Sequence, residues 1–320
     1  MVSLYLKNKG SAVRFCFWPR MKIKIGNQIK YWYRKYTPKS IRIFIIKLIP
    51  FWIQLRFFQL QTKKFDFQVH GHGEAKKLIE LTEKLDIKSG YYVDIGASDG
   101  WSSSATFPFA KNSNFSGLSI ELDDKKFKKM QFIYSKFENT HTSKSKVTPE
   151  NVVEILNKFD VPQNFDILNL DIDSYDLFVI KKLLEFYRPK IISMEINEKI
   201  PPPVYFTVTY DENHFWKGDH FFGCSLQAAY EEVSKFDYKL YTLIYNNAIF
   251  IPKEMNLEFQ NLTVEKFYKD GYVNKSDRKE KFSYNADIDV LLDMKQEDVV
   301  IFLNNFFKDY HGMFILESGK

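Results

Sequence analysis

Hydrophobic positions along the middle of the chain follow a repeating order, in which short apolar runs alternate with longer segments that carry apolar residues at helical spacing. The short runs predict strands and the longer segments predict amphipathic helices. Strands that alternate with helices indicate a parallel sheet covered on both faces. The predicted strands are 91–95, 115–120, 165–170 and 191–196, with a weaker one within 137–147, and the predicted helices are 74–86, one beginning near 101–104, 123–134, one beginning at Thr148, 177–187 and one beginning at Ser225.

Two further strands, 238–244 and 248–252, are joined by a short Asn-containing link, which suits a hairpin. The predicted fold class is therefore α/β, a mostly parallel seven-stranded Rossmann-like sheet with a terminal antiparallel hairpin and helices on both faces. Beyond this pattern, 198–224 is expected to be irregular, 253–283 to be a polar, loop-rich insertion, and 294–310 to be an amphipathic helix with an apolar packing face.

Charge divides the chain into unlike parts. The formal net charge is +6, but residues 1–65 hold 15 Lys or Arg and no acid, and the remainder, with the other 31 basic residues and all 40 acidic ones, is at −9. Such a split suggests an interaction arm on a separately folded body. We therefore expect a basic, aromatic N-terminal arm over 1–70, a folded domain over 71–253 and a C-terminal extension over 254–320.

Within the arm, residues 41–60 have the length and much of the apolar character of a membrane-spanning helix. Arg42, Lys47 and Arg56 oppose spanning, because each charge costs roughly 2.5–3.5 kcal/mol near the bilayer centre, and Pro50 interrupts a helix. Basic and aromatic residues together favour a segment lying on an anionic membrane surface. Packing of the arm on the folded domain is the main alternative, and nucleic-acid binding is the least favoured one.

Cysteine usage points to a reducing compartment. Only Cys16 and Cys224 occur, and they have no metal-ligand spacing. This excludes a disulfide framework and fits a cytoplasmic protein, which the arm would hold at the inner face of the membrane. His70 and His72 are expected to be loop residues, because no third ligand is adjacent.

The first candidate site is the glycine-rich run that follows the first strand of the folded domain. Ligands of such sheets bind at the carboxyl ends of the strands. Glycines let the backbone approach a ligand closely, a helix beginning here would offer free N–H groups to a carboxylate, and the first acid could accept from an ammonium group. The run suits the amino-acid end of S-adenosylmethionine better than the G-x-G-x-x-G dinucleotide pattern, with an ordinary tight turn as the alternative. The residues assigned to the cofactor here are Asp94, Gly96, Ala97, Ser98, Gly100 and Ser102.

An acid at the end of the second strand supports the same cofactor. Glu121 lies 27 residues after Asp94, and an acid at this place can accept hydrogen bonds from ribose hydroxyls. Because Asp123 and Asp124 follow directly, an ordinary surface acid is the alternative. Strand, glycine loop, helix, strand and acid in this order favour an adenosine-containing cofactor.

A third group of polar residues ends the fourth and fifth strands. Asp171 and Asp173 follow the fourth strand, and Glu195 and Asn197 end the fifth, so all four are expected on the side of the transferred methyl group. They could act as a general base on a hydroxyl, orient a sugar through hydrogen bonds, or hold Mg²⁺ through oxygen ligands. Helix capping by Asp173 or Asp176 is the alternative.

These motifs together resemble FkbM-like class I methyltransferases, over about residues 90–252. The resemblance implies a Rossmann-like methyltransferase fold, an S-adenosylmethionine cofactor and, often, O-methylation of sugars or secondary metabolites. Two positions depart from the family pattern: Ser98 stands where Asn or Gly is common, and Ser174 where Gly is usual. The matching segments are Val93–Gly100, Ile120-Glu121, Val147–Asn151, Asp171–Asp176, Met194–Asn197, Tyr210-Asp211, Phe222–Leu226 and Asn247-Ala248.

The sequence therefore predicts an S-adenosylmethionine-dependent O-methyltransferase whose acceptor is a sugar, glycan or glycolipid precursor. Asp171 is assigned to the cofactor, and Asp173 is assigned as base or acceptor-orienting group, assisted by Glu195 and Asn197; no metal site is assigned, and Mg²⁺ stays open. One alternative is a nucleotide-sugar glycosyltransferase that uses Asp171-Ile172-Asp173 as a metal site. Another is a non-catalytic, membrane-associated protein on the same fold.

The membrane hypothesis predicts that the full-length protein floats with anionic vesicles at low salt. Each basic side chain of the arm near the surface adds about 1 kcal/mol of attraction, and added salt should release the protein by screening these charges. A flotation gradient measures the partition, with neutral vesicles as the control. Protein that stays at the bottom with anionic vesicles at low salt contradicts the hypothesis.

Overall fold

The computed structural model describes residues 5–8, 11–14, 50–61, 72–102, 104–255 and 262–318. The chain divides into two compact units, Met1–Phe58 and Gln59–Lys320. In the first unit, strands β1 (Tyr5–Asn8) and β2 (Ser11–Arg14) pair antiparallel.

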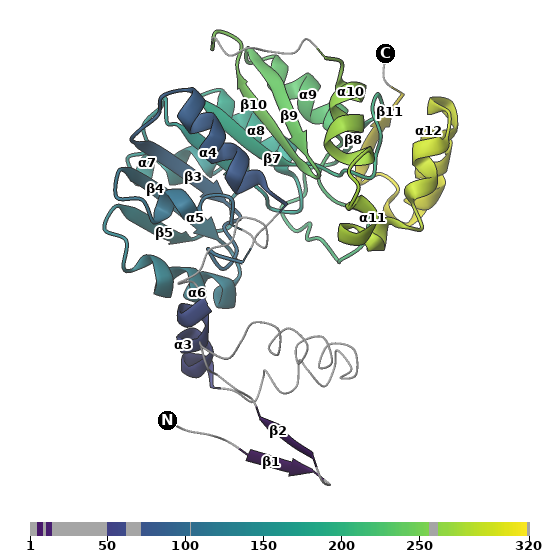
Figure 1. The fold of residues 1–320 in the computed structure, drawn as a ribbon. Coiled ribbons are helices and arrows are strands. Elements are labelled where there is room, and N and C mark those ends of the chain that lie inside the picture. Colours follow the sequence, from purple (N-terminus) through teal and green to yellow (C-terminus); the bar gives the residue numbers. More distant parts are fainter. Residues whose placement is uncertain are drawn as a thin grey trace. The chain divides into compact units, whose positions relative to one another are not determined.

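Little of the predicted arm falls within the described residues. Helix α3 (Phe51–Gln61) begins directly after Pro50 (Figure 1), whereas 41–49, the first part of the predicted membrane-surface segment, lie outside the described residues. Among the helices that the structure describes, none is long and apolar enough to cross a membrane.

The second unit is built on a seven-stranded sheet. Its strands are β3 (Gly90–Ile95), β4 (Phe115–Glu121), β5 (Thr140–Lys144), β6 (Ile167–Leu170), β7 (Ile191–Glu195), β9 (Tyr238–Ile244) and β10 (Asn247–Pro252). They lie in the order β5-β4-β3-β6-β7-β10-β9 (Figure 1). The first five run parallel, and β10 is antiparallel to both β7 and β9. The predicted fold class, including its terminal antiparallel hairpin, is confirmed.

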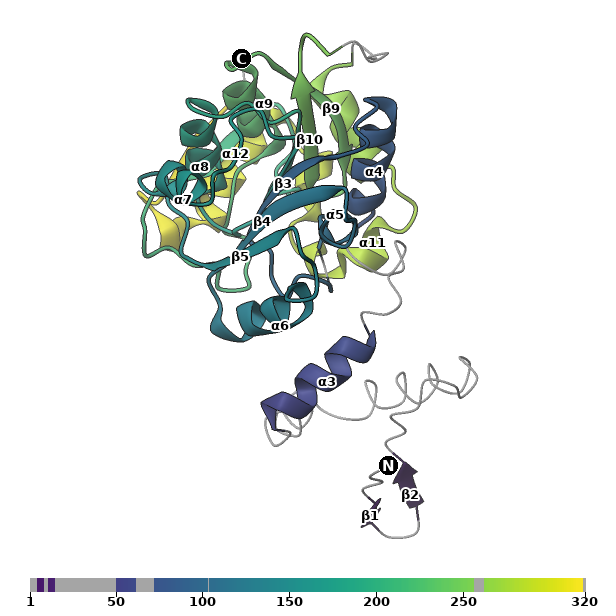
Figure 2. The same cartoon turned by 90° about the vertical axis from the view of Figure 1, so that its left-hand side faces the viewer.

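Helices cover both faces of this sheet. Figure 2 shows α4 and α5 on one face and α7, α8 and α9 on the other. Strand β6 is buried along its whole length, which is why its residues form a nearly continuous apolar run rather than an alternating one. The helices are α4 (Glu74–Lys84), α5 (Phe107–Ala110), α6 (Asp124–Tyr134), α7 (Val152–Lys158), α8 (Asp176–Leu184) and α9 (Leu226–Ser234).

Of the predicted helix starts, the one at Ser225 is confirmed and the one at Thr148 is displaced. Ser225 caps α9 as predicted, since its side chain accepts from the N–H of Ala228. Thr148 precedes a turn, in which its N–H donates to Asn151 Oδ1 at 2.8 Å, and α7 begins only at Val152.

The helix predicted to begin near 101–104 does not form there. The carboxylate of Asp99 accepts from the N–H groups of Trp101 at 3.1 Å and Ser102 at 2.7 Å, and these bonds hold a tight turn in place of a helix start. Helix α5 begins instead at Phe107, whose N–H donates to Ser104 Oγ at 3.0 Å.

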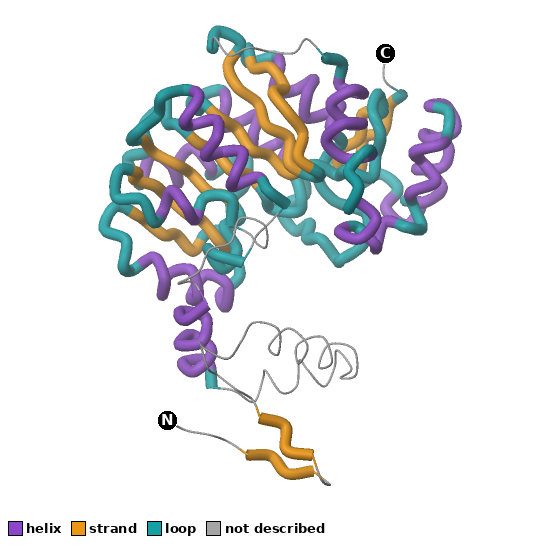
Figure 3. The backbone as a smooth tube through the Cα atoms, in the orientation of Figure 1, coloured by secondary structure: helices purple, strands orange, loops and turns teal. Residues whose placement is uncertain are grey.

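The segments around and after the hairpin contain more structure than the polar pattern indicates (Figure 3). Strand β8 (Tyr205–Val208), inside the stretch expected to be irregular, pairs antiparallel with β11 (Phe314–Glu317). The prediction that 253–283 is a loop-rich insertion is wrong, since most of the described part of this segment is helical. The remaining helical elements are α10 (Val264–Tyr268), a π-helical turn Lys269–Val273, α11 (Arg278–Lys281), α12 (Gln296–Phe306) and short 3₁₀ turns at Ser283–Asn285, Asp289–Asp293 and Lys308–Tyr310.

A close backbone contact explains why these polar-looking segments fold onto the sheet. A Cβ on Gly271 would lie 2.4 Å from the carbonyl oxygen of Leu243 in β9, and the carbonyl of Gly271 accepts from the N–H of Tyr245 at 2.9 Å. Tyr272 and Phe282 are then fully buried against the same core. The hydrophobic pattern does not predict this structure, because the apolar residues involved are sparse and tertiary contacts order them.

An aromatic cluster ties the end of the chain to the segment that contains β8. Phe307 is 2% exposed and its ring centroid lies 5.5 Å from Phe206, 5.3 Å from Phe221 and 6.0 Å from Phe314. Phe307 thus belongs to the apolar face predicted for 294–310, and it packs against the segment that contains β8.

Truncation of Phe307 to Ala is expected to lower the free energy of unfolding by about 3–5 kcal/mol, the usual cost of emptying a buried Phe site. Phe306→Ala is the matched control, because its side chain is 38% exposed, and its effect should be well below half as large. Urea unfolding followed by circular dichroism measures both, and equal effects would contradict the packing described.

Candidate functional site

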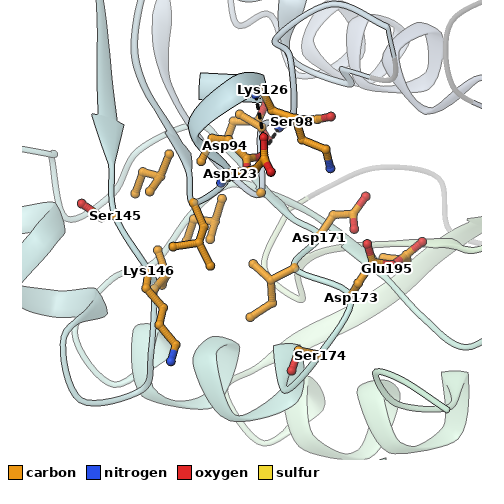
Figure 4. Close-up of a pocket in the computed structure, with 18 of the residues that line it drawn as sticks. Asp94, Ser98, Asp123, Lys126, Ser145, Lys146, Asp171, Asp173, Ser174 and Glu195 are labelled. Atoms are coloured by element: carbon orange, nitrogen blue, oxygen red, sulfur yellow. Dashed lines mark hydrogen bonds between the residues drawn. The ribbon is translucent and has the colours of Figure 1, made fainter. Parts of the chain in front are cut away.

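The carboxyl ends of β3, β4, β6 and β7 surround one cavity of about 640 Å³. Pockets that hold cofactors and small ligands are usually of this size. Figure 4 shows acidic, Ser and Lys side chains from separate strands, loops and α6 gathered around it. Of the residues predicted from the sequence, those that line the cavity are Asp94, Gly96, Ala97, Ser98, Glu121, Asp171, Asp173 and Glu195.

The glycine of the first loop is required by a backbone contact across the cavity floor. Gly96 has φ +86°, and a Cβ there would lie 1.6 Å from the carbonyl oxygen of Asp171. The N–H of Asp171 in turn donates to the carbonyl of Ile95 at 2.9 Å. The loops after β3 and β6 are thus joined backbone to backbone, which only glycine permits at this place.

Glu121 joins the loop after β3 to the end of β4. Its Oε2 accepts from the N–H of Ser98 at 2.8 Å, and its Oε1 accepts from the N–H of Asp123 at 2.6 Å. Ser98 has φ +53°, a left-handed conformation that few non-glycine residues adopt. Since a carboxylate offers about four lone pairs, Glu121 keeps two of them for a ligand.

Asp94 lies at the floor of the cavity with 1% of its surface exposed. Its Oδ2 accepts from Thr106 Oγ1 at 2.5 Å and its Oδ1 accepts from Asn169 Nδ2 at 2.8 Å. Burial raises the pKa of Asp94 to about 6 in spite of these bonds. Its orientation is therefore set by two neighbouring side chains.

Two members of the predicted cofactor loop lie away from the cavity. Gly100, with φ +72°, accepts at its carbonyl from the Tyr134 hydroxyl at 2.9 Å, so it anchors the loop to α6. Ser102 does not line the cavity, and its N–H and hydroxyl both donate to Asp99, the hydroxyl at 2.6 Å. The prediction that a helix start at Ser102 presents free N–H groups to a carboxylate is therefore wrong.

Three carboxyl groups meet on the other side of the cavity. Oxygen atoms of Asp171, Asp173 and Glu195 all lie within 4.8 Å of one another, and Figure 4 shows the three side chains together. Burial, followed by mutual repulsion, raises the pKa values of Asp171 and Glu195 well above their usual range, and burial raises that of Asp173. Carboxyls this close share protons or are neutralised by a cation, because they cannot all be ionised together.

The loop that carries Asp173 is held by Asp176, the first residue of α8. The carboxylate of Asp176 accepts from the N–H groups of Ile172 at 2.9 Å and Ser174 at 3.0 Å, and burial raises its pKa to about 6. Asp173 has φ +54° and lines the cavity. Of the two capping candidates, only Asp176 bonds the loop in this way.

Asn197 does not reach the cavity, contrary to its predicted place beside the reacting groups. It is fully buried, and its Nδ2 donates to the carbonyl oxygens of His220 at 2.9 Å and Phe222 at 3.1 Å. Asn197 thus fixes the segment before α9, and its part in the site is to hold that segment in place. Glu195, by contrast, accepts at Oε1 from Asn246 Nδ2 at 2.7 Å, in the turn of the terminal hairpin.

Several residues of the cavity wall are not predicted by the sequence pattern. His214, Phe215 and Trp216 line it from the irregular segment after β8, and Lys126 and Lys146 line it from α6 and the β5–α7 loop. The irregular segment has no periodicity from which such positions could be inferred. One available signal is composition, since His214, Phe215 and Trp216 are consecutive in a polar stretch. In the structure Phe215 is 55% and Trp216 is 43% exposed although both are large and apolar.

No protein-family model matches the sequence, and no curated protein matches it. Among solved structures, the chain is similar to the N-terminal domain of EvdMO1 with SAH and D-fucose, at 8% identity over 56% of this chain and 82% of that one, with a TM-score of 0.37. It is similar to the CurJ carbon methyltransferase at 11% identity over 72% and 71%, with a TM-score of 0.42. It is also similar to precorrin-6y C5,15-methyltransferase from Geobacter metallireducens GS-15, at 15% identity over 56% and 85%, with a TM-score of 0.34. At such low identities and TM-scores, these similarities carry no argument about the activity of this chain.

The raised pKa of Asp94 predicts how stability depends on pH. Because the folded-state pKa of about 6 exceeds the ordinary 3.8, the contribution of this carboxyl is fully present below about pH 4 and is lost as the pH rises through about 6. Asp94→Asn is expected to flatten this fall by up to about 3 kcal/mol, since one pKa unit corresponds to about 1.4 kcal/mol.

Urea unfolding at intervals between about pH 4 and pH 8 measures the slope for the wild type and for Asp94→Asn. Glu83→Gln, at an exposed position of α4, is the control and should leave the slope unchanged. A variant curve that runs parallel to the wild-type curve would show that Asp94 does not produce the fall.

Proposed function

We propose that this chain is an S-adenosylmethionine-dependent methyltransferase. The observation that carries the proposal is a single cavity which joins the Gly96 loop and Glu121, on one side, to the carboxyl cluster of Asp171, Asp173 and Glu195, on the other. A cofactor bound between them would supply an activated methyl group on a sulfonium. The residues of the cluster would then bind and orient the acceptor beside it.

The geometry of the cofactor side fits the amino-acid and ribose parts of this molecule. The backbone of Gly96 and Ala97 lines the cavity without side-chain bulk, and Asp94 offers carboxylate oxygens at its floor. Glu121 keeps two lone pairs for ribose hydroxyls. Leu122, which follows it, lines the cavity and is 43% exposed, so it offers an apolar contact to a flat base.

The acceptor side fits a polyhydroxylated molecule. Carboxyl oxygens accept hydrogen bonds from hydroxyl groups, and the exposed rings of Phe215 and Trp216 on the same wall give apolar faces against which a sugar ring can pack. We therefore propose O-methylation of a sugar, glycan or glycolipid precursor, with Asp173 and Glu195 holding its hydroxyls. Mg²⁺ would compete for the same carboxyl oxygens, so methyl transfer is measured both with and without it.

The basic arm suggests where such an acceptor would be met. Fifteen positive charges in residues 1–65 would hold a cytoplasmic enzyme at the anionic inner face of the membrane. A glycolipid precursor presents its sugar at that surface. A location at the inner face of the membrane and a glycolipid acceptor are thus two parts of one proposal.

Calorimetry with S-adenosylmethionine is the direct test. The wild type is expected to bind, and Glu121→Gln is expected to bind about 10–100-fold more weakly, because a hydrogen bond to a charged group contributes about 1.5–3 kcal/mol. Asp124→Asn is the matched control, since this acid is half-exposed, is paired with Lys128 and Lys144, and does not line the cavity.

Transfer is then measured with tritiated S-adenosylmethionine and a panel of methyl glycosides, with and without EDTA or added Mg²⁺. Absence of cofactor binding by the wild type would overturn the proposal. Manganese-dependent hydrolysis of a nucleotide sugar would favour the glycosyltransferase reading of Asp171 and Asp173. Cofactor binding without transfer to any glycan pool would favour a non-catalytic protein on this fold.

A further inference from the structure

His214 is held against the acceptor side of the cavity by one residue of the β6–α8 loop. Ser174 Oγ lies 2.7 Å from His214 Nδ1 and 3.2 Å from the carbonyl oxygen of the same His214. Ser174 is 4% exposed and His214 is 9% exposed, and both line the cavity. The ring also packs edge-on against Phe221, at 5.7 Å between centroids.

These two short contacts select one tautomer of the imidazole. A serine hydroxyl has a single proton, so Ser174 can donate to only one of its two partners. The carbonyl of His214 can only accept, whereas Nδ1 can either donate or accept. If Ser174 donates to that carbonyl, His214 Nδ1–H donates to Ser174 Oγ and both contacts become hydrogen bonds. If Ser174 donates to Nδ1 instead, the carbonyl contact is lost. The arrangement with two bonds leaves the lone pair on Nε2.

The lone pair on Nε2 is available to a ligand. Within the described part of the chain, no group forms a hydrogen bond with Nε2, and the ring belongs to the cavity wall. His214 stands two residues before Trp216 in the sequence and contacts Ser174, the residue after Asp173, and all four residues line the same cavity.

We propose that His214 is the general base of the reaction and that Ser174 is the positioning residue that sets its tautomer. The inference rests on the proposed methyltransferase function. The acceptor oxygen forms a bond to the methyl carbon as the carbon–sulfur bond breaks, and the electron pair of that bond stays on sulfur as a neutral thioether. The hydroxyl proton passes to His214 Nε2, and the resulting imidazolium returns it to solvent.

The electrical surroundings of His214 suit this role. Burial lowers the pKa of His214, with Lys217 acting in the same direction and Asp211 and Asp219 acting against it. The ring is therefore neutral near pH 7 and able to accept a proton. From the β6–α8 loop, the group that contacts the ring is the neutral hydroxyl of Ser174, and the carboxylates of Asp211 and Asp219 would stabilise the imidazolium once it forms.

The tautomer is tested without any acceptor by long-range ¹⁵N–¹H spectra of histidine-labelled protein. His214→Gln assigns the resonance by its loss among the six histidines. The wild type is expected to show Nδ1–H, and Ser174→Ala is expected to shift the population toward Nε2–H. A wild-type ring protonated at Nε2 and deprotonated at Nδ1 overturns the inference, whatever the enzyme methylates.

Transfer to the methyl glycoside panel gives the second test. His214→Gln is expected to lower kcat by about 10²–10⁴-fold, with cofactor affinity within about twofold of wild type, and Ser174→Ala is expected to lower kcat by at least about tenfold. Wild-type kcat should fall as the pH drops through the pKa of His214, and this limb should disappear in His214→Gln. Lys217→Gln is the control on the same segment, and it should retain kcat while moving that limb to higher pH, since the charge of Lys217 lowers this pKa.

The two ideas fail in different ways. An active wild type whose kcat and pH profile survive His214→Gln overturns the base assignment and leaves the methyltransferase proposal standing. A wild type that does not bind S-adenosylmethionine overturns the methyltransferase proposal and the base assignment with it. If the cofactor binds but no glycoside is methylated, the tautomer of His214 remains the test: a proton on Nδ1 supports the inference, and a proton on Nε2 overturns it.

Discussion

The carbonyl oxygen of Asp171 occupies the space where a side chain on Gly96 would have to be. This contact brings the loop after β3 and the loop after β6 to a backbone separation that only glycine allows. Residues of both loops line the cavity. Asp94 and Ala97 lie on the β3 side of this contact and Asp173 lies on the β6 side, so the contact sets the distance between these parts of the cavity lining.

Around that junction, the charged groups are oriented by neutral partners rather than by opposite charges. Thr106 and Asn169 bond Asp94, two backbone N–H groups bond Glu121, and Asn246 bonds Glu195. Hydrogen bonds of this kind orient a carboxylate without forming an ion pair that would cancel its charge. Burial raises the pKa values of Asp94 and Glu195, which is a common property of groups that handle protons or bind polar ligands.

The last part of the chain supports the acceptor side from behind. Phe221 stacks on Tyr310 at 3.9 Å between ring centroids, and the N–H of Thr209 donates to the carbonyl of Met313 at 2.8 Å. These contacts hold both ends of the segment that carries His214. The C-terminal part of the chain thus holds in place the segment that forms one wall of the cavity.

Local pattern was sufficient for the sheet and for part of the cavity lining. Strand and helix periods, the glycine loop and the acid that ends β4 are separated by short stretches of chain, so the parallel sheet itself brings Asp94, Gly96 and Glu121 to one edge. The position of Ser102 could not be inferred in this way, because the side chain of Asp99 takes the N–H groups that a helix start would have left free. The burial of Asn197 and the approach of His214 to Ser174 depend on a segment without periodicity, 40 residues further along the chain from Ser174. Only the tertiary structure could decide these positions, because they arise from contacts between residues far apart in sequence.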